Sequence, residues 1–319
     1  MRSAIHFIIF LLAFLAPTAH AACTDKEVKI VLSISPSEAD DSALQHALAL
    51  ENGIAKSLKG KACIEISKGA LSETLVAGTA QLAVTSFREL AKDVPLYSIF
   101  DLPFAFRNEF AWQKFSSSPS PFSAALQSKG LTGLGYRLDG FEQMAGKVDF
   151  LKPANATGLR FRKVPNKTSL IALLSATAKE ISDDELAAAL KDGRADAHFA
   201  TFSSMQKANT LASQKVVTQT NHRLIGGQVL VSTKWWNSLD VKLRLAVGKT
   251  IEATTLVYNA KLANTRNLNR TNVLRANPVV SLTRKQRNKW VETVQPLTTE
   301  FRNIDGSAAI LNLLETVNR

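Results

Sequence analysis

The chain has 319 residues, of which 45% are hydrophobic and 21% are charged. Such a chain can bury one large core or two medium-sized ones, which excludes a disordered, collagen-like or small disulfide-dependent protein. The formal net charge of +12 is compatible with nucleic acid, an anionic membrane or an acidic ligand as partner, but an aromatic content of 7% is low for a surface that stacks bases.

The first segment, residues 1–22, has the pattern of an export signal. Arg2 precedes an apolar run over 5–16, and Ala19-His20-Ala21 follows as the small-x-small site that a signal peptidase reads. This run is shorter than the roughly 20 residues of a membrane-spanning helix. We therefore expect residues 1–22 to be removed and the mature protein to be exported and soluble.

Cys23 and Cys63 are the only cysteines, and an exported protein usually pairs such residues. Free thiols are one alternative. Lipidation of Cys23 is another, although His20 stands where a lipobox has an apolar residue. A disulfide would place the predicted strands 28–34 and 63–67 side by side with level starts. A helical pattern follows each strand, as in the βαβ units of a parallel sheet.

Strand and helix patterns alternate along the rest of the chain. Strands are predicted over 81–85, 131–138, 140–145, 159–163, 195–200, 216–219 and 228–232. Helices are predicted over 41–58, 72–77, 109–115, 121–129, 167–175, 183–191, 203–212 and 238–268, the last with Ser238 as its N-cap. An α/β succession of this length is typical of two domains with a ligand-binding cleft between them.

Motifs of catalysis and of metal binding are missing from the sequence. The chain lacks GxSxG, GxxxxGK[ST] and GxGxxG, and His46, His198 and His222 have no i, i+4 pairing of the kind found in zinc sites. The SxxK match at 204–207 lacks its usual KTG partner. We therefore expect a binding protein without cofactor or metal, and not an enzyme.

Five segments carry a resemblance to a known family. They are GALSETLVAGTAQLAV (69–84), IFDLPFAF (99–106), GLRFR (158–162), DELAAALKDGRADA (184–197) and GQVLVS with Trp235-Trp236 and Leu239 (227–239). The third is similar to a G-x-K-[IL]-R strand and the fourth to an E-v-y-x-A-L-x-x-G-x-v-D-G stretch. In order and spacing the segments resemble the solute receptors (DctP-type) of TRAP transporters.

The resemblance implies a two-domain α/β clamshell, a type II-like periplasmic-binding-protein fold with a long spine helix. The implied domains are 23–139 plus 228–268 (domain I) and 140–227 plus 269–319 (domain II). The implied function is a periplasmic receptor that closes over an organic acid and delivers it to a membrane permease. Two alternatives remain: a clamshell protein that serves an ABC permease or sensor with an amino-acid or cationic ligand, and a periplasmic enzyme or envelope-interaction protein.

Arg162 is the residue that the resemblance assigns to the ligand carboxylate. It holds the arginine position of the G-x-K-x-R strand, and a guanidinium offers a planar fork of donors that matches a carboxylate. Arg160 is a competitor on the same strand face, whereas Lys163 lies on the opposite face. The alternative is that Arg162 pairs with an acid of the protein.

Three departures from the family pattern fall at the expected cleft. Glu142 stands where many members have a second arginine, His198-Phe199-Ala200 replaces Q-E-N, and Asp183 stands where an aromatic lid is common. Glu142 or Asp183 would either satisfy Arg162 internally or recognise an amino, hydroxyl or cationic group. We therefore expect a monocarboxylate or zwitterionic ligand and not a dicarboxylate held by two arginines.

Glu73 and Phe104 complete the predicted binding residues. Glu73 follows a glycine-containing turn at a helix start, where it either contacts the ligand or caps the helix. Phe104 follows Pro103 and either lines the apolar wall of the cleft or packs in the core.

The positive charge is concentrated near the C-terminus. Residues 253–291 contain eight basic and no acidic side chains: Lys261, Arg266, Arg270, Arg275, Arg284, Lys285, Arg287 and Lys289. Export argues against nucleic acid as a partner. If the stretch 261–289 takes part in binding, we expect weak attraction to an anionic membrane surface or an acidic permease surface.

Overall fold

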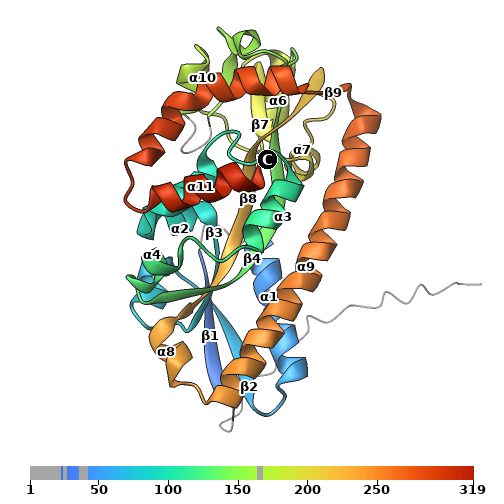
Figure 1. Cartoon of the computed structure of the whole chain (residues 1–319). Coiled ribbons are helices and arrows are strands. Elements are labelled where there is room, and N and C mark those ends of the chain that lie inside the picture. Colours follow the sequence, from blue (N-terminus) through green and yellow to red (C-terminus); the bar gives the residue numbers. More distant parts are fainter. Residues whose placement is uncertain (1–22, 24–26, 36–41, 164–167) are drawn as a thin grey trace, which may run out of the picture.

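A single sheet runs through both lobes of the computed structural model (Figure 1), which describes the chain except for residues 1–22, 24–26, 36–41 and 164–167. The predicted signal peptide lies outside the described residues. The strand order is β2-β1-β3-β8-β4-β7-β5-β6, with β9 beside β8. The strands are β1 (Val28–Ile34), β2 (Ala62–Lys68), β3 (Leu82–Ser86), β4 (Leu131–Gly146), β5 (Arg160–Arg162), β6 (Thr177–Lys179), β7 (Ala197–Ala200), β8 (Val216–Ser232) and β9 (Val279–Ser281).

The helices cover both faces of this sheet (Figure 1). They are α1 (Ser42–Ser57), η2 (Ser72–Val76), α2 (Phe87–Asp93), η3 (Pro95–Asp101), α3 (Glu109–Ser116), α4 (Ser123–Gln127), η4 (Pro153–Ala156), α5 (Thr168–Leu173), α6 (Leu186–Asp192), α7 (Phe202–Lys207), α8 (Thr233–Ser238), α9 (Val241–Ala276), α10 (Arg284–Arg302) and α11 (Ser307–Val317). The α/β class predicted from the sequence is confirmed.

The first lobe is built on the parallel strands β1, β2 and β3, and the second lobe on the parallel strands β5, β6 and β7. Val28 of β1 lies opposite Ala62 of β2, so the two strands start level. A disulfide joins Cys23 to Cys63, with their Cα atoms 5.7 Å apart. The predicted disulfide and the predicted strand pair are therefore both confirmed.

The two long strands β4 and β8 pair antiparallel through both lobes. The sequence predicted each of them as two separate strands, and that division is wrong. The pairing continues through β-bulges near Gly140 and Glu142. A bulge adds an unpaired residue and bends the strand, and its glycine and polar residues break the apolar alternation by which a strand is recognised.

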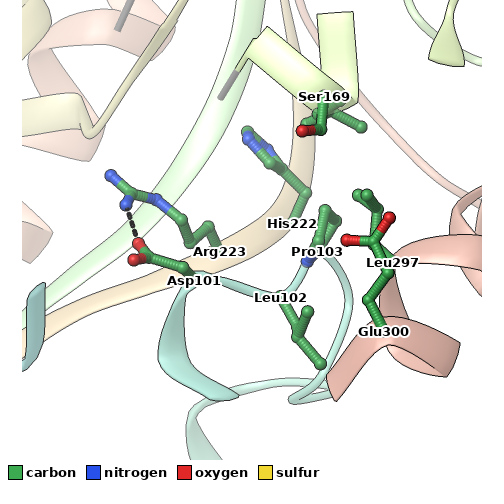
Figure 2. Close-up of a pocket in the computed structure, with 9 residues that line it drawn as sticks. Asp101, Leu102, Pro103, Ser169, His222, Arg223, Leu297 and Glu300 are labelled. Atoms are coloured by element: carbon green, nitrogen blue, oxygen red, sulfur yellow. Dashed lines mark hydrogen bonds and ion pairs between the residues drawn. The ribbon is translucent and has the colours of Figure 1, made fainter. Parts of the chain in front are cut away.

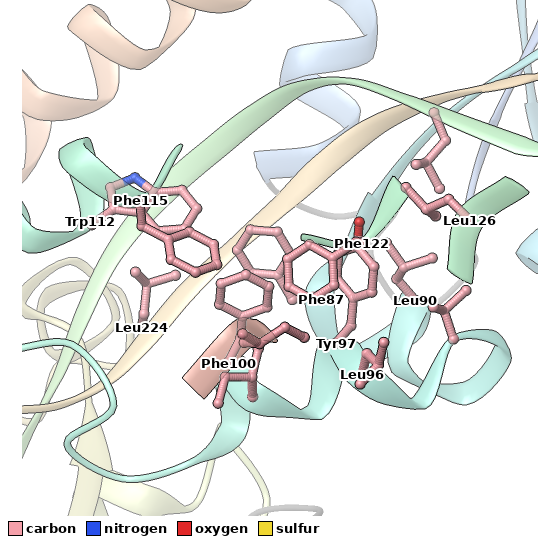
Figure 3. Close-up of a cluster of buried hydrophobic side chains, with 14 of the residues drawn as sticks. Phe87, Leu90, Leu96, Tyr97, Phe100, Trp112, Phe115, Phe122, Leu126 and Leu224 are labelled. Carbon is pink, nitrogen blue, oxygen red and sulfur yellow. The ribbon is translucent and has the colours of Figure 1, made fainter. Parts of the chain in front are cut away.

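The first lobe has a core on each face of its sheet, because neighbouring residues of one strand point to opposite faces. Val84 and Val229 pack with α1 and α9, whereas Ala83 and Leu230 belong to an aromatic cluster. Figure 3 shows that cluster, in which Phe87, Tyr97, Phe100, Trp112, Phe115 and Phe122 gather between the sheet and the surrounding helices.

The C-terminal helices connect the two lobes. Trp290 and Val294 of α10 lie in the core of the second lobe, with Phe161 of β5. Phe301 at the end of α10 and Leu314 of α11 lie in the aromatic core of the first lobe. The predicted boundaries, which give residues 269–319 to one domain, remain a prediction.

Helix α9 has 36 residues and extends along both lobes (Figure 1), where it packs on α1, β4 and α7. Its N-cap is Asp240, whose carboxylate accepts hydrogen bonds from the backbone N–H groups of Lys242 and Leu243. The predicted N-cap Ser238 is wrong, because that residue ends the preceding helix α8. Within the described part of the chain, no helix combines the length and the apolar character needed to cross a membrane.

Candidate functional site

The carboxyl ends of parallel strands from both lobes point toward the middle of the β4–β8 pair. Ser86 at the end of β3 lies opposite Gly227 of β8, and β1 runs parallel to β3. Ala200 at the end of β7 lies opposite Gln143 of β4, and β5 runs parallel to β7. Open α/β sheets bind ligands outside the carboxyl ends of their strands, so the junction between the lobes is the candidate site.

Arg162 is the last residue of β5, so it stands at the carboxyl end that is directed toward this junction. Its Nη2 is 2.5 Å from Oδ1 of Asp183, and its Nε donates to the carbonyl of Ile181. The Arg162 side chain is 21% exposed, whereas that of Asp183 is 79% exposed. Because Asp183 lies largely in water, the pair is weak, and another carboxylate can replace Asp183 without leaving a buried charge.

Arg160 is half-buried and is paired with a buried acid of the second lobe. Its Nε and Nη2 each lie 2.8 Å from a carboxylate oxygen of Asp196, and Lys147 contacts the same carboxylate. The hydrogen bond from Arg160 holds the pKa of Asp196 well below its usual range. Arg160 therefore balances a buried acid, and Arg162 is the arginine with an exposed partner.

Glu142 is buried and has a different partner from the one expected. Its carboxylate accepts two hydrogen bonds from Arg223, at 2.9 and 3.0 Å. Nη1 of Arg223 reaches Asp101 at 2.5 Å. The negative charge of Glu142 is therefore balanced within the fold. Sequence reasoning missed Arg223, although a single arginine within a strand pattern is a usable signal that a buried acid lies nearby.

A cavity of about 140 Å³ borders this ion-pair group (Figure 2). Figure 2 shows Asp101 directed at Arg223, with Ser169, His222 and Glu300 on the other sides. Its walls come from the end of η3 and the two residues after it, from β8, and from helices α5 and α10. The lining residues are Asp101, Leu102, Pro103, Ser169, Leu170, His222, Arg223, Leu297 and Glu300. Residues of both lobes therefore enclose it.

His198 of β7 is only 1% exposed. Its Nε2 lies 2.8 Å from Oε1 of Gln214, and its Nδ1 has no hydrogen-bond partner among the described residues. Burial lowers the pKa of His198 to about 4, and the charge of Arg162 contributes to the lowering. The imidazole is thus neutral near pH 7 and does not compete with Arg162 for an anion.

We expect the free energy of unfolding to fall as the pH drops from about 6.5 toward 4. The pKa of His46 is also lowered, to about 3, mainly by burial. Both imidazoles take up protons in the unfolded chain near pH 6.5 but resist them in the folded one. Each therefore costs up to about 1.4 kcal/mol per pH unit in this window.

Urea titrations at pH 7.0, 5.5 and 4.5 measure this loss. In His198→Gln the pH slope should be smaller by up to one proton, while Gln127→Ala, at an exposed residue without a titratable side chain, should leave the slope unchanged. An unfolding free energy that is constant between pH 7.0 and 4.5 contradicts the assignment.

Glu73 and Phe104 occupy different environments. Glu73 is an exposed residue in the first turn of η2. Phe104 is 5% exposed and belongs to the core of the second lobe. Its φ of 62° is unusual for a residue with a side chain, and its N–H donates to the carbonyl of His222. Ligand contact by either residue remains a prediction.

Comparison with known proteins places the chain in a family. Residues 40–304 match the bacterial extracellular solute-binding proteins, family 7. The C4-dicarboxylate-binding periplasmic protein DctP of Vibrio cholerae is 29% identical over 94% of each chain. DctP of Rhodobacter capsulatus is 28% identical, over 75% of this chain and 74% of its own.

Solved structures of TRAP periplasmic solute-binding proteins share the fold. The protein from Ochrobactrum anthropi superimposes with a TM-score of 0.80 at 19% identity, covering 92% of this chain and 96% of its own. The protein from Pseudomonas aeruginosa, solved with bound L-malate, has a TM-score of 0.68 at 25% identity and covers 86% and 99%. Because the family match spans most of the sequence, this chain belongs to the bacterial extracellular solute-binding proteins of family 7.

Proposed function

We propose that this chain is the periplasmic receptor of a TRAP-type transporter, which binds a small organic carboxylate between its lobes and passes it to the membrane permease. The observation that carries the proposal is Arg162, a guanidinium at the converging strand ends whose only charged partner among the described residues is the exposed Asp183. The chain is similar to proteins named as C4-dicarboxylate-binding periplasmic proteins and as TRAP periplasmic solute-binding proteins, which supports the same role.

The charge balance at the junction favours a ligand with one carboxylate gripped by arginine. Arg160 and Arg223 are already held by buried acids. Arg162 is the remaining strand-end arginine, and a bidentate guanidinium–carboxylate pair is strong where water is expelled. A monocarboxylate or a zwitterion fits this arrangement better than a dicarboxylate that needs two arginine clamps.

In this mechanism Asp183 occupies Arg162 until the ligand arrives. The incoming carboxylate takes the place of Asp183, which returns to water at little cost because it is already exposed. The lobes then close about β4, β8 and α9, the elements that cross the junction. For this hinge we propose the division 23–139 plus 228–268 and 140–227 plus 269–319.

We expect Asp183→Asn to raise carboxylate affinity about two- to fivefold, the range expected from removing a competing exposed ion pair. Calorimetric titration with lactate, pyruvate, succinate and L-malate measures the change. The matched control is Asp192→Asn, which breaks another exposed pair of the second lobe, with Arg194, and should leave affinity unchanged. Weaker binding by Asp183→Asn would show that Asp183 itself contacts the ligand.

The basic stretch 261–289 supports a lesser proposal of contact with an anionic membrane or permease surface. Arg266 and Arg287 are engaged inside the protein, with Glu109 and with the carbonyls of Phe104 and Phe106. Arg270 lines a cavity beside α9, so the other five basic residues would make the contact. We expect weak co-sedimentation with vesicles rich in anionic lipid at 0.01 M salt. It should be lost at 0.5 M salt, because the Debye length falls from about 30 Å to about 4 Å. No co-sedimentation at low salt contradicts this proposal.

A further inference from the structure

A second and larger cavity, of about 260 Å³, lies beside α9. It shares no residue with the cavity at Arg223, and Arg162 is not among the residues that line it. The walls come from α3 and β4, from α7 and β8, and from α9: Asn108, Glu109, Asp139, Gly140, Phe141, Gln143, Thr201, Phe202, Ser203, Gln219, Asn221, Arg266, Asn267 and Arg270. Both lobes and the spine helix therefore meet at this cavity.

The charges of this lining leave one guanidinium without an acid. Arg266 lies 2.6 Å from Glu109 and also donates to the carbonyl of Leu138. Asp139 is paired with Arg137 at 3.0 Å. Arg270 donates only to the neutral oxygen Oε1 of Gln219, at 3.2 Å, and no acid within ion-pair distance is found for it in the described ranges. The lining therefore carries one positive charge, on the exposed Arg270, that no acid of the protein pairs with among the described residues.

The amides of the lining add donors but few acceptors. The oxygen of Asn108 accepts from the backbone N–H of Ala111, that of Asn221 accepts from Gln143, and that of Gln219 accepts from Arg270. The oxygens of these three amides are thus in use, while the NH₂ groups of Asn108, Asn221 and Gln219 donate to no described residue. Asn267 also lines the cavity, and neither its amide oxygen nor its NH₂ group has a partner among the described residues. An occupant that is rich in acceptors and negatively charged would complement them.

We propose that this cavity is a second binding site, which takes a small inorganic oxyanion such as phosphate or sulfate. Arg270 supplies the charge, and the three amide NH₂ groups supply further hydrogen bonds to the anion oxygens. The volume lies below the 300–1,000 Å³ range of pockets for drug-sized ligands, so the anion is compact. The site does not depend on Arg162 or on the proposed transport role.

The test is titration of the protein with sodium phosphate and sodium sulfate, each compared with sodium chloride at equal ionic strength. Calorimetry and thermal unfolding should show saturable one-site binding of at least one oxyanion. Arg270→Gln removes the charge, and Gln219→Glu places a carboxylate beside Arg270 with little change of shape. Each should weaken this binding at least tenfold.

Two further variants make the result decisive. Arg275→Gln, an exposed arginine on the last turn of α9 outside the cavity, should bind the anion as the unaltered protein does. Arg162→Ala should also retain the binding, which separates this site from the proposed carboxylate site. The proposal is overturned if no oxyanion binds better than chloride, if both cavity variants keep the binding, or if Arg162→Ala loses it.

Discussion

Replacing Arg162 by alanine is expected to weaken carboxylate binding by roughly 30- to 150-fold. The substitution removes a charged hydrogen-bonding group, and such bonds contribute about 2–3 kcal/mol each to an interaction. Arg162 lies at the end of β5 with an exposed partner, so the loss should appear in affinity and not in folding. Calorimetric titration with the tightest-binding acid of the panel measures it.

Arg160→Ala is the matched control, because Arg160 lies two residues away on the same strand face. Its guanidinium balances the buried Asp196, so its removal should lower the midpoint of urea unfolding and leave affinity within about twofold of the unaltered protein. Arg162→Lys should bind with intermediate affinity, because an ammonium keeps the charge but not the planar fork. Full affinity in Arg162→Ala would show that the carboxylate is gripped elsewhere.

Arg223→Met is expected to lower the free energy of unfolding by about 3–5 kcal/mol, the cost of breaking a buried ion pair from one side. The side chains of Arg223 and Glu142 are only 5% and 8% exposed. Methionine fills similar space but leaves Glu142 and Asp101 without their cation. Urea unfolding followed by circular dichroism measures the loss.

The double variant Arg223→Met with Glu142→Gln should recover part of that stability, because it removes the more buried of the two carboxylates that Arg223 balances. Arg194→Met is the control: its pair with Asp192 is about half exposed on both sides, and its loss should cost under about 0.5 kcal/mol. If Arg223→Met unfolds like this control, the group of Arg223, Glu142 and Asp101 has no structural role.

The local parts of the fold could be predicted from the sequence because short-range patterns encode them. The strands near Val28 and Cys63, the disulfide and most helices up to residue 212 follow from apolar alternation, cysteine pairing and helical periodicity. The choice of Arg162 as a candidate ligand residue also rests on a local motif, the G-x-K-x-R pattern. The ion pair of Arg162 with Asp183 is one of the two arrangements expected for that acid.

The pairing of distant residues could not be predicted. Glu142 and Arg223 are 81 positions apart, and only the register of β4 against β8 makes them neighbours. That register depends on bulges, which shift the pairing without leaving a hydrophobic signature. The family pattern located Glu142 at the junction but gave no partner for it.

Helices α10 and α11 were not predicted, and for α10 the reason lies in its composition. The sequence of α10 is strongly polar and contains Pro296, which lowers the expectation of a helix. A usable signal was present: Thr283 and Gln286 form a capping box at its start. Because α10 supplies Leu297 and Glu300 to the cavity at Arg223, this omission also hid part of the candidate site.

The central claim is that the carboxylate charge of a small ligand is recognised between the lobes. The most direct test is calorimetric titration of the purified protein with a panel of short carboxylic acids and with the primary amide of each acid. One-site binding by at least one acid, with no detectable binding by its amide, is the result expected. An amide that binds as tightly as its acid, or a panel in which no acid binds, would contradict the claim.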